Sequence, residues 1–219
     1  LVRGDLSDAD RQRLSRRAEE YRQSLRRNAD HPASQIALGN LSLALGDEEA
    51  AGNAYRQALR IDVSYSPASI NLADLYRQRG DEAKAQQILL SARQQADDAA
   101  ISYALSMSYF RQRKLDDGLD AISHAVTLAP MNSDYVYAQA VALEQSGQPL
   151  AAITALEQAL KRQGERRQLV ELLSLYAVNY QLPAEALPHV LRWRTLAPDD
   201  RRAAAIEQGL RRQLARPTQ

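Results

Sequence analysis

Cysteine is missing from this sequence of 219 residues, and aromatic side chains other than tyrosine are scarce. Without cysteine, these residues can form no disulfide bond, thiolate zinc site, covalent c-type haem attachment or cysteine nucleophile. The absence is compatible with any compartment. Beside 10 Tyr there is one Trp, and Phe110 is the only Phe.

A strong net charge and long apolar runs are lacking as well. Lys and Arg number 28 against 27 Asp and Glu, and this balance of +1 gives no general attraction to nucleic acid or anionic lipid. No apolar run approaches the roughly 18 residues of a membrane span, and no secretory signal peptide is recognisable. The chain starts Leu1-Val2-Arg3-Gly4 without an initiator Met, so we expect a piece of a longer protein.

Residue patterns that carry catalysis or bind metals are not found. His31, His124 and His189 lie far apart, and no pair has the i, i+4 spacing of a helical metal site. No G-x-S-x-G, P-loop or G-x-G-x-x-G motif occurs. Acidic pairs such as Glu48-Glu49 fall at expected helix starts, where their negative charge interacts favourably with the helix dipole. We therefore expect no metal, no cofactor and no enzymatic activity.

The chain contains a repeated motif: "YRQSLR" at residues 21–26 returns as "YRQALR" at 55–60, 34 positions later. Followed along the chain, the first position of the motif is always large: Tyr21, Tyr55, Leu89, Ile122, Leu156 and Val190. The fourth residue before it is small (Ala51, Ala85, Gly118, Ala152, Ala186), and so is the third after it (Ser24, Ala58, Ala92, Ala125, Ala159), with Trp193 as the exception. Helices approach closely only where one presents a small residue, so the alternation predicts close helix packing.

Each period reads as two helices joined by a turn. In residues 33–45, apolar positions recur at helical spacing, Gly46 and Asp47 interrupt them, and residues 48–61 resume the pattern. The equivalent turn positions hold Gly80, Arg113, Gly147 and Gln181. We expect five such units, because a single pair would leave its apolar face in water and stacking buries it. Their predicted bounds are 32–65, 66–98, 99–132, 133–166 and 167–200.

Both ends are expected to cover the array. Residues 1–31 are predicted to form an N-terminal half-repeat, with one helix over 8–28 that includes Leu25 in phase, and residues 201–219 a C-terminal capping helix and tail. Ser7 followed by Asp10 fits a variant of the capping box. The arginines near both ends are mixed with acidic residues, which favours solvated helix faces over a nucleic-acid patch.

These repeats resemble the tetratricopeptide repeat (TPR), whose consensus is bulky–x2–Leu–Gly–x2–Tyr, then Ala–x3–Phe, Ala and Pro. The matching residues, unit by unit, are Leu38, Gly39, Gly46, Ala51, Tyr55 and Ala58; Leu72, Ala73, Tyr76, Gly80, Ala85, Leu89 and Ala92; Leu105, Ser106, Tyr109, Gly118, Ile122, Ala125 and Pro130; Ala140, Leu143, Gly147, Ala152, Leu156 and Ala159; and Leu173, Ser174, Ala186, Val190 and Pro198. No Trp opens a first helix, three units lack the closing Pro, and Gln139 replaces the usual Leu. The resemblance implies an all-α, right-handed superhelical solenoid with the first helices on its concave side.

Three stretches also resemble the C-terminal TPR region of large bacterial multihaem c-type cytochrome proteins. They are "YVYAQAVALEQSG" at 135–147, "QLVELLSLYA" at 168–177 and "LRWRTLAPDD" at 191–200. This resemblance implies a partner-binding tail without the redox part and a periplasmic location. Without it, a cytoplasmic location is expected.

The TPR resemblance also implies a ligand groove lined by first-helix residues. In-phase counting gives the candidates Asn40, Asn71, Asp74, Arg77, Tyr103, Met107, Phe110, Arg111, Tyr137, Val141 and Glu144, together with Ile36, Leu43, Ile70, Glu171 and Leu175. Met and aromatic residues suit adaptable binding surfaces. Tyr103, Met107, Phe110, Tyr137 and Val141 would form an apolar stripe with a charged rim. The alternative is that these side chains pack against neighbouring helices.

The expected function is a non-catalytic protein–protein interaction scaffold that binds a peptide or an amphipathic helix. A structural role, as a docking or self-association module of a larger protein, is the alternative. TPR domains that bind chaperone C-terminal carboxylates resemble one another in a five-residue clamp, of which Asn40 and Asn71 match here. Ile36, Ala100 and Ala104 occupy its three basic places, so no carboxylate clamp is expected.

Overall fold

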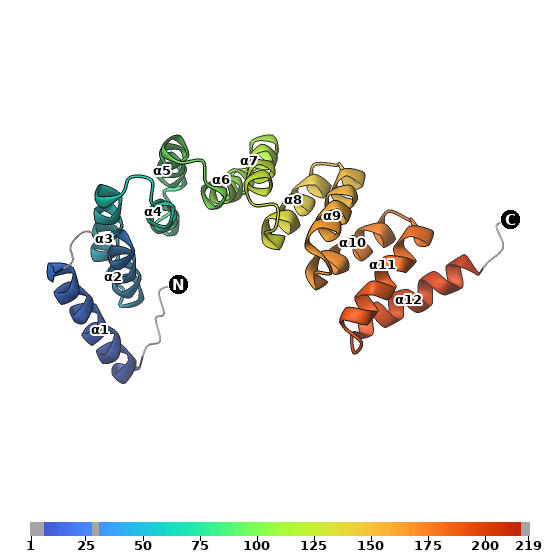
Figure 1. The fold of residues 1–219 in the computed structure, drawn as a ribbon, viewed down its shortest axis with the longest axis horizontal. Helices are drawn as coiled ribbons and strands as arrows, with labels where there is room; N and C mark the ends of the chain where they lie inside the picture. Colours follow the sequence, from blue (N-terminus) through green and yellow to red (C-terminus); the bar gives the residue numbers. More distant parts are fainter. Residues whose placement is uncertain (1–6, 28–30, 216–219) are drawn as a thin grey trace. The chain divides into compact units, whose positions relative to one another are not determined.

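The structure, a computed structural model, describes residues 7–27 and 31–215, which form twelve α-helices and no strand (Figure 1). The expected all-α fold is therefore confirmed. The helices, in chain order, are α1 (Asp8–Arg27), α2 (Pro32–Ala44), α3 (Glu48–Ile61), α4 (Ser66–Gln78), α5 (Glu82–Gln95), α6 (Ala99–Arg111), α7 (Leu115–Leu128), α8 (Ser133–Gln145), α9 (Pro149–Gln163), α10 (Arg167–Asn179), α11 (Pro183–Leu196) and α12 (Arg201–Leu214).

Two compact units make up the chain, residues 1–108 and 109–219, with the boundary inside α6. In the first unit each helix from α1 to α4 packs on the next one, and α2 also touches α4. In the second unit each helix from α7 to α11 packs on the next one, and α8 also touches α10. In both units, the first helices of successive pairs are therefore neighbours in space.

The turn inside each helix pair has one recurring geometry. Gly46, Gly80 and Gly147 have φ angles between 77° and 85°, and the equivalent Arg113 and Gln181 have φ angles of 60° and 57°. The residue after each of them donates its amide to a carbonyl five positions earlier, at 2.9 Å from Asp47 to Ser42 and 3.0 Å from Lys114 to Tyr109. This is the hydrogen bond of a left-handed helix C-cap, which satisfies a free helix carbonyl. The same turn therefore forms with or without glycine.

The repeated large residues are buried, as the alternation of sizes predicts. Tyr55 is 1% exposed, Leu89 3%, and Ile122, Leu156 and Val190 0%. The small residues four positions before them are also buried. Trp193, which stands where the other units have Ala, is itself 0% exposed. Tyr21 on α1 is half-buried, while the side chains of Ser24 and Leu25 lie outside the described residues.

Helices α1 and α12 stand at the two ends of the described residues. At the start of α1, the Ser7 hydroxyl donates to Asp10 Oδ2 at 2.7 Å and accepts from the Asp10 amide at 3.1 Å, which confirms the predicted capping box variant. On α12, Ala203 and Leu210 are buried. Leu210 lies in one apolar cluster with Ala177, Ala186 and Val190. The arginines at 201, 202, 211 and 212 are exposed.

Candidate functional site

In the first unit, the predicted groove residues of α2 and α4 come together around a buried tyrosine. The Asn40 Oδ1 atom accepts hydrogen bonds from the Tyr55 hydroxyl at 2.7 Å and from Asn71 Nδ2 at 3.1 Å. We call these three residues the asparagine cluster. Burial, followed by the charge of Asp74, raises the pKa of Tyr55 to about 12.

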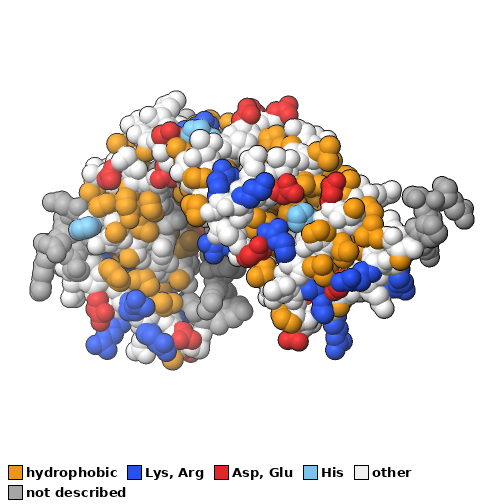
Figure 2. Space-filling view, turned by 45° about the vertical axis from the view of Figure 1, so that its right-hand side comes forward, with side chains coloured by type: hydrophobic (Ala, Val, Ile, Leu, Met, Phe, Trp, Pro, Cys, Tyr) orange, Lys and Arg blue, Asp and Glu red, His pale blue; other side chains and the backbone are white. Residues whose placement is uncertain are grey.

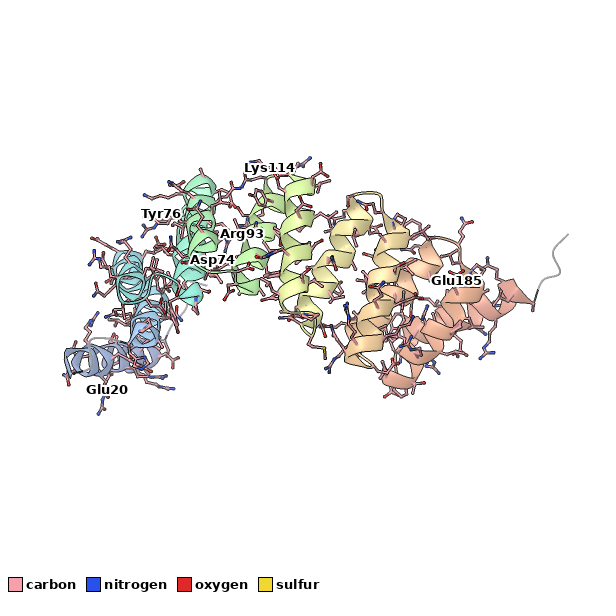
Figure 3. The ribbon with its side chains drawn as sticks, turned by 45° about the horizontal axis from the view of Figure 1, so that its top comes forward. Glu20, Asp74, Tyr76, Arg93, Lys114 and Glu185 are labelled. Atoms are coloured by element: carbon pink, nitrogen blue, oxygen red, sulfur yellow. The ribbon has the colours of Figure 1, made fainter. Side chains whose placement is uncertain are left out.

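Two charged candidates of α4 neutralise each other. Arg77 Nε lies 3.0 Å from Asp74 Oδ1, one turn apart on the helix. Asp74 and Tyr76 are marked on α4 in Figure 3. Tyr76 belongs to the neighbouring side of this helix, where Lys84 Nζ of α5 lies 4.5 Å from the centroid of its ring. The rim of the first unit is thus polar but carries little net charge.

On α6, Tyr103 and Met107 are half-buried within the first unit, whereas Phe110 and Arg111 fall in the second. The Phe110 ring lies against Gly118 of α7, so closely that a Cβ atom on Gly118 would overlap it. Phe110 therefore packs, at least in part, against the second helix of its own pair. The continuous stripe from Tyr103 to Val141 stays a prediction.

In the second unit, residues of α8 and α10 form a cluster that the sequence predicts only in part. Tyr180, at the end of α10, donates its hydroxyl to Glu144 Oε1 of α8 at 2.8 Å. Burial, then the charge of Glu144 and the Tyr137 and Tyr180 hydroxyls, raise the pKa of Tyr176 to about 12. The hydrogen bond to Glu144 raises the pKa of Tyr180 as well. We call Tyr137, Glu144, Tyr176 and Tyr180 the tyrosine–glutamate cluster.

The four members of the tyrosine–glutamate cluster differ in exposure. Tyr176 is 7% exposed, Glu144 is half-buried, and Tyr180 and Tyr137 are 37% and 41% exposed. Val141, another predicted residue, is half-buried on α8 and packs on the apolar core of the second unit. The cluster therefore has a buried base and an accessible rim of two tyrosine rings beside a carboxylate.

Sequence reasoning missed Tyr176 and Tyr180 because in-phase counting placed Glu171 and Leu175 at the groove positions of α10. A signal was present in "YAVNY", which spaces the two tyrosines four residues apart and therefore on one side of a helix. Their proximity to Glu144, 36 positions before Tyr180, depends on how α8 and α10 pack.

Other features of the described residues do not indicate chemistry. No group of three or more His, Asp or Glu residues among them could hold a metal ion, and none of their helices is long and apolar enough to span a membrane. His31 is exposed and His124 half-buried. His189 is largely buried beside Glu157, whose Oε1 atom lies 3.6 Å from the His189 Nε2 atom.

The visible surface is chemically mixed. On the face shown in Figure 2, Lys and Arg side chains are interspersed with Asp and Glu over the described residues. An open pocket of about 400 Å³ lies in the first unit between α3, α4 and α5, with Leu59, Leu72 and Ile88 among its lining residues. The predicted groove residues do not line this pocket.

Stacked helix pairs with one repeated turn and one repeated packing contact define an all-α repeat protein. A family model described as tetratricopeptide repeat matches residues 7–67 and 137–201, and a second model with the same description matches residues 42–108. The chain belongs to the tetratricopeptide repeat family, as the sequence resemblance suggests. This family membership makes the chain a protein–protein interaction scaffold. The narrower resemblance to cytochrome-linked repeats stays a prediction.

Solved structures of other proteins share the fold at low sequence identity. YrrB, described as a TPR protein with an unusual peptide-binding site, is 17% identical with a TM-score of 0.62, over 87% of this chain and 99% of that chain. PilF of Pseudomonas aeruginosa is 18% identical with a TM-score of 0.65, over 84% of each chain. Yeast Tom70 is 14% identical with a TM-score of 0.71, over 97% of this chain and 45% of that chain. Among curated proteins, none matches this chain.

Proposed function

We propose that the chain is a non-catalytic scaffold that holds a peptide or a helical segment of a partner protein against its first helices, among them α2 and α4 in the first unit and α8 and α10 in the second. The observation that carries this proposal is the accessible rim of the tyrosine–glutamate cluster, where Tyr137 and Tyr180 remain 41% and 37% exposed. Tyrosine is enriched at protein interfaces because its ring is apolar while its hydroxyl can still find a hydrogen-bond partner.

The asparagine cluster supports the same proposal for the first unit. An Asn side chain offers both donors and acceptors, so Asn40 and Asn71 can bond to the peptide groups of an extended segment. The hydrogen bonds from Tyr55 and Asn71 to Asn40 fix the orientation of the Asn40 amide before any ligand arrives. Side chains that are already ordered lose less conformational entropy on binding. The peptide-binding site that is described for YrrB adds support by analogy of fold.

A selection with phage-displayed random twelve-residue peptides tests this proposal. We expect recovered peptides to bind the chain in solution. The variant Tyr137→Ala should bind them about tenfold more weakly, because the exposed ring supplies contact area. Tyr137 is preferable to Phe110 for this purpose, since Phe110 packs against Gly118 and its removal would also change stability. The matched control is Leu150→Ala, which removes a side chain that is 67% exposed at the start of α9.

Two results would count against the proposal. One is the failure to recover any peptide that binds the folded chain in solution. The other is binding that Tyr137→Ala leaves intact while Leu150→Ala removes it. The alternative function, self-association, has its own signature in light scattering. It predicts that the wild-type chain is oligomeric and that Tyr137→Glu reduces the oligomer size, whereas peptide binding predicts no change.

A further inference from the structure

Helices α8 and α10, the first helices that lie wholly in the second unit, together carry more acidic than basic residues. Helix α8 contains Asp134 and Glu144 and no Lys or Arg. Helix α10 contains Glu171 and a single cation, Arg167, whose Nη2 atom lies 3.5 Å from Asp200 Oδ2. By contrast, the groove residues of α4 balance each other through the Asp74–Arg77 ion pair. A ligand that contacts α8 therefore meets a helix whose charged side chains are all acidic.

Glu144 is the acidic member of the tyrosine–glutamate cluster. Its Oε1 atom accepts the Tyr180 hydroxyl at 2.8 Å, and among the described residues no Lys, Arg or His forms an ion pair with it. A half-buried carboxylate loses part of its hydration, and a cation that reaches it restores the lost stabilisation. The carboxylate is thus positioned to bind a positive charge that the described residues do not supply.

The tyrosine rings favour the same kind of ligand. The face of an aromatic ring carries negative electrostatic potential and attracts ammonium and guanidinium groups, more strongly where water is partly excluded. The chain already makes one such contact, between Lys84 and the Tyr76 ring. The methylene groups of a Lys or Arg side chain can also cover the exposed ring of Tyr137 while the charged end reaches Glu144.

We propose that the tyrosine–glutamate cluster is a specificity pocket for a Lys or Arg side chain of the bound peptide, held between the rings of Tyr137 and Tyr180 and paired with Glu144. This inference rests on the proposed function, because it assigns a partner chemistry to the same first-helix surface. It makes the preferred partner a basic segment of another protein. An acidic segment, a neutral segment and a second copy of this chain are the competing occupants.

The test uses the twelve-residue peptides recovered by phage display, labelled with fluorescein and measured by fluorescence anisotropy at about 50 mM salt. We expect Lys or Arg at one fixed position of the recovered sequences. Replacement of that Arg by citrulline, or of that Lys by norleucine, should weaken binding about five- to tenfold. The variant Glu144→Gln should bind the basic peptide more weakly by a similar factor. The amide oxygen of the new side chain can still accept the Tyr180 hydroxyl.

A double-mutant cycle shows whether the two groups are in contact. Against Glu144→Gln, the basic and the neutral peptide should bind equally, because the partner of the charge is gone. Glu185→Gln makes the same change of charge on an exposed residue of α11, marked in Figure 3, and should leave the basic peptide unaffected. Tyr137→Phe should retain binding, and Tyr137→Leu should lose part of it, because only the former keeps an aromatic face.

Three other outcomes overturn the inference, each in a different way. Recovered peptides without a Lys or Arg preference, or additive effects in the double-mutant cycle, overturn the basic-residue pocket and leave the scaffold function standing. The absence of any binding peptide overturns both. A wild-type dimer in light scattering that Glu144→Gln dissociates assigns the cluster to a second copy of the chain instead. If Glu144→Gln lowers the melting temperature, the peptide-side replacements still decide the question.

Discussion

At the scale of single residues, packing depends on positions that tolerate no Cβ atom. A Cβ atom on Gly39 would overlap the Tyr55 ring, and one on Gly118 would overlap the Phe110 ring. Both contacts join the two helices of one pair, so a large ring fills the space that glycine leaves. Gly209, on α12, is different because nothing lies within 4 Å of its added Cβ position.

This difference predicts opposite effects of the same substitution. Gly118→Ala should lower the free energy of unfolding by about 1–3 kcal/mol, because the Phe110 ring must move to make room. Gly209→Ala should raise it by up to about 1 kcal/mol, because alanine has the higher helix propensity. Urea denaturation followed by circular dichroism measures both. Equal effects would contradict the steric account.

The tyrosine–glutamate cluster predicts a specific alkaline sensitivity. The folded-state pKa of Tyr176 is about 12 and the unfolded value is 10. The stability that this hydroxyl contributes is fully present below pH 10 and is lost as the pH rises toward 12. At pH 11 the loss should reach about 1 kcal/mol. Phenylalanine cannot ionise. The free energy of unfolding of Tyr176→Phe should therefore fall by about 1 kcal/mol less between pH 8 and pH 11 than that of the wild type. If the free energy of unfolding of Tyr176→Phe falls as much as that of the wild type, folding does not raise the pKa of Tyr176.

At the scale of helices, the starts of the second helices share one backbone geometry but not one cap. Asp47 and Asp81 have φ angles of −90° and −93°, and their side chains accept the amides of Ala50 and Lys84. Lys114, labelled in Figure 3, has nearly the same conformation, with φ −89° and ψ 77°. Its side chain makes no cap hydrogen bond. The start of α7 is therefore a cap site that holds the wrong side chain.

Replacing Lys114 by Asp or Asn should stabilise the protein by about 0.5–1 kcal/mol, whereas Asp81→Ala should destabilise it by about 1 kcal/mol. Asp and Asn both supply the acceptor oxygen that lysine lacks. Lys114→Ala is the control, since it removes the positive charge without adding an acceptor. Thermal melting compares the four variants, and stabilisation by alanine equal to that by asparagine would attribute the effect to charge alone.

At the scale of the whole molecule, stability is expected to be local. Helices in each compact unit contact mainly their neighbours in sequence, and such arrays behave as sums of units and nearest-neighbour contacts. The single Trp, Trp193, is fully buried in the second unit. Its fluorescence therefore reports on that unit, whereas circular dichroism reports on all helices.

Two core variants should separate these signals. Leu210→Ala, which removes a buried contact between α12 and the Ala186–Val190 cluster, should cost about 2–4 kcal/mol and shift the Trp193 transition to lower urea. Gly39→Ala, in the first unit, should shift the circular dichroism transition more than the Trp193 transition. If Gly39→Ala moves both transitions by the same amount, the chain unfolds as one cooperative body.

The sequence by itself determined the helix pairs, their turns and the buried residues of the core. These features are local: the helical spacing, the small residue four positions before each large one and the turn position of Gly46. They recur every 33 or 34 residues, so one repeat unit predicts the same features in the other units. Even Arg113 and Gln181 could be assigned to the turn without glycine, because their places in the period are fixed.

The tertiary structure alone decided which side chains meet between helix pairs. Glu144 and Tyr180 are 36 positions apart, and they meet because α8 packs beside α10, at an offset that no periodic count contains. In the same way, Phe110 was assigned to the ligand surface by its phase, yet its ring lies over Gly118 because that glycine leaves room for it. Periodicity specifies the face of a helix, whereas the neighbour of each side chain depends on the packing distance and on the sizes of the residues opposite.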